Sequence, residues 1–118
     1  MCQKAFGNAF GPLVTANGLV WTHGAPKHFR SSNKVRRGFC GDCGTPLSYE
    51  PDGFKPEIAI CALDDPNAAP PAIQVGLESR LPWFETLASL PTRPPAEQAT
   101  IDRFLATMRS NQHPDHDT

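Results

Sequence analysis

The fold is decided by KHFRSSNKVRRGFCGDCGTPLSYE, residues 27–50, in which short runs alternate apolar and polar side chains. The runs KHFRS, VRRGF and PLSYE are separated by turn-forming residues, a punctuation typical of antiparallel strands. Two similar runs follow, EIAIC at 57–61 and IQVGLE at 73–78. We therefore expect a mainly β domain of short antiparallel strands that continue to about residue 79.

Upstream of these runs, PLVTANGLVWT at 12–22 places two apolar, β-branched stretches around Asn17 and Gly18. Both residues tolerate the positive φ that a two-residue hairpin turn requires. The pattern predicts a β-hairpin there.

The period of the apolar residues changes near the C-terminus. After the proline-rich LPTRPP, the residues Ile101, Phe104, Leu105 and Met108 follow one another at helical spacing. We expect one C-terminal helix over roughly 95–110, its apolar stripe packing on the sheet or on another subunit. The chain then divides into a β domain at 1–90 and a linker, helix and polar tail at 91–118. His113 and His116 lie in that tail, where we expect a frayed terminus.

Composition limits the class of protein. The 118 residues are enough for one domain, and no apolar run approaches the ~20 residues of a membrane span. The start MCQK does not resemble a secretory signal, so we expect a cytoplasmic protein without membrane contact. Four cysteines in such a reducing compartment indicate reduced thiols or metal ligands.

Positive charge is concentrated early in the chain. Residues 1–50 hold six Lys or Arg and two Asp or Glu, although the net charge is −1 and the pI about 6.4. This balance argues against a general nucleic-acid binder. The basic stretch 27–37 is either the solvated face of a hairpin or a rim that attracts a small anionic ligand.

The strongest chemical motif is FCGDCG, which carries Cys40 and Cys43. Two thiolates at this spacing can bind one tetrahedral zinc, but they make half a site. The other two ligands would be Cys2, His23 or His28, or the same pair on another chain. We expect Cys61, within EIAIC, to be a small buried hydrophobe rather than a ligand. The two histidines are expected at the surface.

Several segments together resemble the glutathione-dependent formaldehyde-activating enzyme family, whose relatives include centromere protein V. They are CQKAFG, HFRSS, RRGFCGDCGTPL, LDDP and ESRLPWF, in this order, and the resemblance covers most of residues 2–84. It implies an Mss4-like β-tent, an all-β architecture, with a structural and a catalytic zinc site.

Carried over by position, the resemblance implies that Cys40 and Cys43 are half of the structural zinc site. Cys2 matches the last cysteine of the catalytic C-x-C-x-x-C motif, so it is expected to be both a metal ligand and a catalytic residue. The early C-x-C and the first two catalytic cysteines have no match in this sequence. We expect Met1 to be an internal methionine of a longer gene product, and this form to be a poor catalyst.

The resemblance also implies an activity. Family members assemble S-hydroxymethylglutathione from formaldehyde and glutathione, a reaction of the carbon–sulfur lyase class. Arg30 and Arg37 are our candidates to bind the carboxylates of a glutathione-type ligand. The alternative is a non-catalytic, zinc-stabilised β binding module. We expect a homo-oligomer, in which two chains pool Cys40 and Cys43 or cover an exposed sheet edge.

Overall fold

A computed structural model describes residues 1–112 in two compact units, Met1–Arg80 and Leu81–Gln112. His113 and His116 lie outside the described residues. The first unit contains a short helix, α1 (Cys2–Phe6), and five strands: β1 (Leu13–Thr15), β2 (Lys27–Arg30), β3 (Val35–Phe39), β4 (Pro46–Pro51) and β5 (Glu57–Ala59). Three 3-10 turns follow at Ile60–Ala62, Pro66–Ala68 and Leu77–Ser79. The second unit contains a 3-10 helix at Phe84–Ser89 and the helix α2 (Pro95–Leu105).

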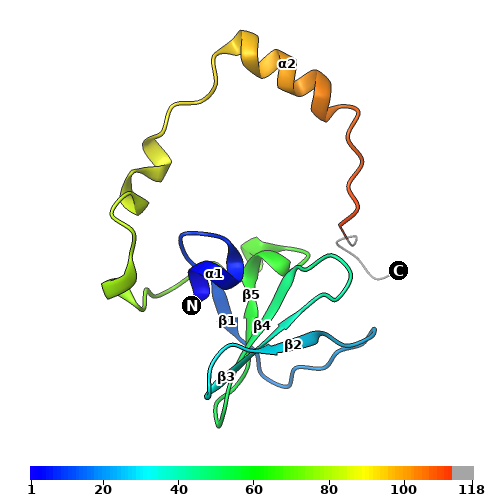
Figure 1. Cartoon of the computed structure of the whole chain (residues 1–118), viewed down its shortest axis with the longest axis vertical. Coiled ribbons are helices and arrows are strands. Elements are labelled where there is room, and N and C mark those ends of the chain that lie inside the picture. The colour runs from blue at the N-terminus through cyan, green and yellow to red at the C-terminus, as the bar shows by residue number, and fades with distance from the viewer. Residues whose placement is uncertain (113–118) are drawn as a thin grey trace. The chain divides into compact units, whose positions relative to one another are not determined.

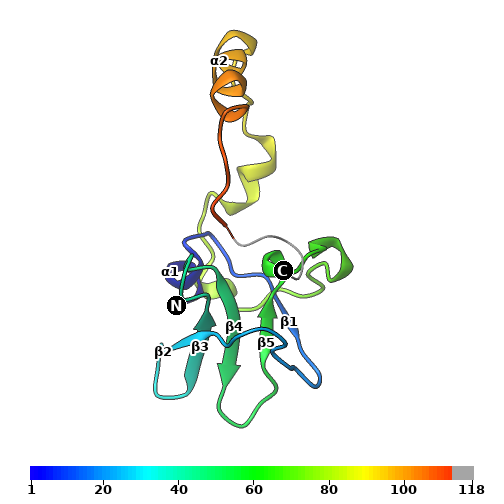
Figure 2. The ribbon, with the colours of Figure 1, turned by 90° about the vertical axis from the view of Figure 1, so that its right-hand side faces the viewer.

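The five strands form one antiparallel sheet in the order β1-β5-β4-β3-β2. Figures 1 and 2 show them side by side, with α1 at one end of the sheet. Within residues 1–112, Val35, Ala59 and Ile60 are the buried apolar residues, each no more than 6% exposed. The mainly β fold with a C-terminal helix is thus confirmed, while the likeness to a β-tent stays a prediction.

The register of the central strands decides which side chains share a face. Phe29 of β2 pairs with Arg37 of β3, and Arg37 pairs with Tyr49 of β4. Since successive residues of a strand point to opposite faces, Arg30 and Arg36 belong to the other face. This alternation separates two groups of polar residues that are neighbours in the sequence.

The hairpin predicted around Asn17 and Gly18 is wrong. Gly18 has the expected positive φ of 67°, but β1 ends at Thr15 and pairs with β5. Val20 and Trp21, in the stretch after the turn, are exposed and not in a strand. A β-branched run becomes a strand only where a neighbouring strand completes its hydrogen bonds, and here β5 takes that position beside β1.

The run IQVGLE is not a strand either, and the last strand ends at Ala59 rather than near residue 79. Ile73 and Val75 are more than 80% exposed, so their β propensity has no packed surface to act on. Cys61 is also exposed, contrary to the prediction, because the chain leaves β5 for a 3-10 turn and the strand alternation stops.

The C-terminal helix is confirmed, with Pro95 at its first position and its end at Leu105, five residues earlier than expected. No residue of α2 is buried, and Phe104, Leu105 and Met108 are exposed. Along residues 1–112, none of the helices has the length and apolar character needed to cross a membrane.

Candidate functional site

The helix α1 holds Cys2 close to the sheet. It ends at Gly7, whose φ of 58° is the left-handed conformation that terminates helices, and the chain then turns back. At Gly11 a Cβ atom would lie 2.7 Å from the ring of Phe6 and 3.4 Å from Cβ of Cys2, so any larger residue would have to displace the ring of Phe6. The side-chain amide of Gln3 donates to the carbonyl of Ser79 at 2.9 Å, which ties the helix to a distant segment.

Arg37 connects Cys2 to the sheet. Its Nη2 donates to Sγ of Cys2 at 3.3 Å and its Nε to Oγ of Ser31 at 3.1 Å. The guanidinium also lies over the ring of Tyr49, 4.9 Å from the centroid. Arg37 is only 8% exposed.

The partners of Arg37 are all uncharged in their usual forms. Among the residues that the structure describes, no carboxylate pairs with it. Burying a cation without a counter-ion is costly, so hydrogen bonds and the tyrosine ring must offset the lost hydration. Such a group favours an anionic ligand beside it.

An open hollow of about 350 Å³ lies against Arg37. Its wall is mainly apolar and includes Ala5 and Phe6 of α1, Phe29 of β2 and Phe39 of β3. The hollow therefore adjoins the segment that carries Cys2, and its lining includes one arginine and three phenylalanines.

Cys40 and Cys43 lie in the turn between β3 and β4. The amide of Cys40 donates to the carbonyl of Thr45, and the amide of Gly44 donates to the carbonyl of Cys40, both at 2.9 Å. Sγ of Cys43 lies 3.0 Å from Oγ1 of Thr45. The positive φ of Gly44, 77°, closes this tight turn.

The described residues do not fit a complete zinc site. A structural zinc needs four ligands, and within residues 1–112 no three His, Cys, Asp or Glu side chains gather where they could hold a metal. Cys2 is not brought together with Cys40 and Cys43, and the roles predicted for these three cysteines stay predictions. No cysteine of the chain is in a disulfide.

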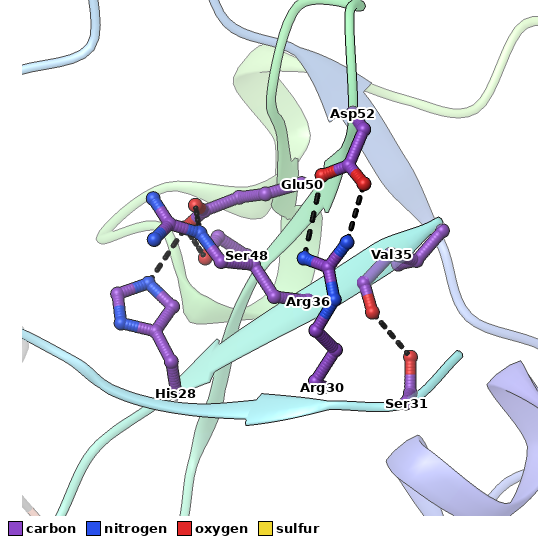
Figure 3. Close-up of polar contacts among 8 residues, drawn as sticks. All are labelled: His28, Arg30, Ser31, Val35, Arg36, Ser48, Glu50 and Asp52. Carbon is purple, nitrogen blue, oxygen red and sulfur yellow. Dashed lines mark hydrogen bonds and ion pairs between the residues drawn. The ribbon is translucent and has the colours of Figure 1, made fainter. Parts of the chain in front are cut away.

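Arg30 and Arg36, the other two arginines of residues 27–37, have acidic partners on the opposite face (Figure 3). Arg30, about half exposed, pairs with Asp52 and also donates to the carbonyl of Asn33 at 3.1 Å. Nε of Arg36 donates to Oε2 of Glu50 at 2.6 Å. Arg30 and Arg37 therefore point to different faces, and their predicted roles in substrate binding are separated in space.

Glu50 is the centre of the network in Figure 3. Its side chain is 14% exposed and also accepts from Nε2 of His28 at 3.0 Å and from Oγ of Ser48 at 2.7 Å. Burial alone would raise the pKa of this carboxyl. The hydrogen bonds from Ser48, His28 and Arg36, with the charge of Arg36, outweigh it, so the pKa lies below its usual value.

Sequence reasoning missed the acidic side of this network and the neighbours of Arg37. The period of two along β4 places Ser48 and Glu50 on one face, and that signal was available in the sequence; Asp52 follows in the turn after the strand. The positions of Ser31 and Tyr49 around Arg37 had no such signal, because they depend on the register of three strands.

The structure thus describes a small antiparallel β domain in which a buried arginine donates a hydrogen bond to the thiol of Cys2. The family model described as glutathione-dependent formaldehyde-activating enzyme matches residues 1–79. The chain belongs to this family, which is generally zinc-associated and connects it with glutathione and formaldehyde. No curated protein and no solved structure matches the chain.

Proposed function

We propose that the protein catalyses the reversible addition of glutathione to formaldehyde, as an S-(hydroxymethyl)glutathione synthase of the carbon–sulfur lyase class. In this reaction the thiol sulfur bonds to the carbonyl carbon, the C=O π bond breaks, and the thiol proton ends on the oxygen. No oxidant or reductant is needed. The observation that carries the proposal is the Cys2 thiol held by buried Arg37 in a member of this family.

In this proposal Cys2 is the catalytic thiol, and Arg37 attracts an anionic part of the glutathione-type ligand. The burial of Arg37 and the lack of a carboxylate partner among the described residues support this role. Arg30 remains a second candidate for a substrate carboxylate. It would first have to leave Asp52, and it lies on the other face of the sheet.

Zinc enters the proposal through Cys40 and Cys43, as two of the four ligands of a structural site. Since no group of three ligands exists along residues 1–112, the other two would come from another chain. We therefore propose a homo-oligomer, and the exposed apolar residues Phe104 and Leu105 of α2 are consistent with a further contact between subunits. A cytoplasmic location is part of the same proposal, supported by four cysteines outside disulfides.

A non-catalytic, zinc-stabilised binding module is the second candidate. Of the three cysteines in the catalytic motif implied by the family resemblance, this sequence matches Cys2 alone, which favours a domain that binds without catalysis. Under this alternative the protein would bind a glutathione-type molecule without accelerating its formation.

The two candidates are separated by the rate of exchange between ¹³C-formaldehyde and S-hydroxymethylglutathione, measured by exchange NMR on the 118-residue chain. We expect exchange above the uncatalysed background, lost in Cys2→Ser and retained in Cys61→Ser, a matched change of an exposed thiol. Background exchange in the unmodified protein, or equal rates for the two variants, would contradict the enzymatic proposal.

A further inference from the structure

We propose that the hollow beside Arg37 is a subsite for an apolar substituent, so that the ligands of this protein include glutathione adducts of aromatic or branched aliphatic aldehydes. The inference rests on the proposed function in placing a glutathione-type ligand at Cys2. It goes beyond that function because these adducts carry a larger, apolar group on sulfur than the hydroxymethyl group that formaldehyde leaves there.

The volume of the hollow is the first argument. At about 350 Å³ it lies within the range of small-molecule sites, whereas a water molecule takes about 30 Å³ in the liquid. Formaldehyde has two non-hydrogen atoms and would fill a small part of this space. The hydroxymethyl group that it leaves on sulfur is equally small.

The wall of the hollow is the second argument. Three phenylalanines, Phe6, Phe29 and Phe39, line it together with Ala5 and Pro46. Phe29 is 65% exposed, although its ring could bury a large apolar area. An apolar substituent placed there would remove both its own surface and that of Phe29 from water.

The distribution of charge is the third argument. Arg37 is the single charged residue in the wall, and its guanidinium also holds the Cys2 thiol. Glutathione as a whole carries two carboxylates and an ammonium group, which an apolar wall with one cation cannot satisfy. The complementary ligand places one anionic group at Arg37 and its apolar substituent against the phenylalanine rings.

Part of the wall lies where β3 and β4 pack closely on each other. Gly38, which also lines the hollow, has no room for a side chain between β3 and β4, because a Cβ there would strike Oγ of Ser48 and lie 3.2 Å from Pro26. The hollow is lined by residues of the sheet and of α1. Substitutions of these lining residues should therefore change the affinity for a ligand that carries an apolar substituent.

Binding of two inert thioethers tests the subsite without any turnover. S-(4-fluorobenzyl)glutathione and S-methylglutathione differ only in the substituent, and their affinities can be measured by NMR titration of the ¹⁵N-labelled chain. We expect the fluorobenzyl compound to bind about tenfold more tightly, with the largest shifts at amides around Phe29 and Arg37.

Two variants locate the effect. Ala5→Leu fills the hollow from the exposed side of α1, and Phe29→Ser removes the exposed ring. Each variant should reduce the ratio of the two affinities, fluorobenzyl over methyl, by at least fivefold. The matched controls are Ala99→Leu on α2 and Phe54→Ser in the β4–β5 turn, both exposed and outside the hollow. These controls should retain the preference.

Equal affinities for the two thioethers, no binding of either, or a preference unchanged by Ala5→Leu and Phe29→Ser would each overturn the inference. So would a change in solution mass with these two variants, because the hollow would then be covered by a second copy of the chain. If the unmodified protein exchanges formaldehyde at the uncatalysed rate but still prefers the fluorobenzyl compound, the proposed catalysis is contradicted and the subsite is supported.

Discussion

Glu50 offers the sharpest test of how the sheet is stabilised. Replacing it by Gln keeps the size of the side chain and removes its charge. The carboxylate is 14% exposed and accepts from Arg36 at 2.6 Å, Ser48 at 2.7 Å and His28 at 3.0 Å. Hydrogen bonds that involve a charged group contribute about 1.5–3 kcal/mol each, and an amide can keep part of them. We expect Glu50→Gln to lower the free energy of unfolding by about 2 kcal/mol at pH 7.

Asp52→Asn is the matched control, since Asp52 also pairs with an arginine of the hairpin, Arg30. Its side chain is half exposed, and exposed ion pairs contribute less than about 1 kcal/mol. Denaturant unfolding of the three proteins at pH 7 measures the comparison. Equal losses for Glu50→Gln and Asp52→Asn would refute the argument that burial distinguishes the two pairs.

The dependence on pH has a defined sign. The pKa of Glu50 is lowered in the folded state, so its contribution to stability is present above the unfolded value of 4.5 and is lost as pH falls through the folded pKa. The difference between the unmodified protein and Glu50→Gln should therefore be largest near neutral pH and shrink below pH 4.5. A difference that grows on acidification would contradict the lowered pKa.

Two further predictions concern the predicted ligands and substrate contacts. The double substitution Cys40→Ser with Cys43→Ser should abolish zinc binding and, if two chains share the metal, halve the solution mass. Elemental analysis measures the zinc content, and light scattering measures the mass. About one zinc per chain in the unmodified protein would contradict the shared site. Arg37→Met should weaken binding of S-methylglutathione about tenfold or more, whereas Arg30→Met should change the affinity less than threefold. NMR titration measures both affinities. A larger loss of affinity in Arg30→Met than in Arg37→Met would show that the exposed arginine is the anion site.

The strands at 27–50 and the helix at the C-terminus could be predicted because their patterns are local. Alternation with turn residues is enough for β2, β3 and β4, and the apolar spacing from Ile101 onwards is enough for α2. The hairpin at Asn17–Gly18 and the strand at 73–78 failed for one reason. Residues 19–22 of the hairpin and residues 73–78 are strand-forming by composition, and neither segment has a neighbouring strand to complete the ladder.

The sequence by itself determined the family, the β class and the candidate thiols, because motifs and periodicity are properties of the chain. Only the tertiary structure decided that Arg37 is buried against Cys2 while Arg30 faces Asp52. The two arginines lie in the same basic stretch and look equivalent there. Strand pairing places them on opposite faces, and the return of α1 at Gly11 brings a thiol from the start of the chain to one of them.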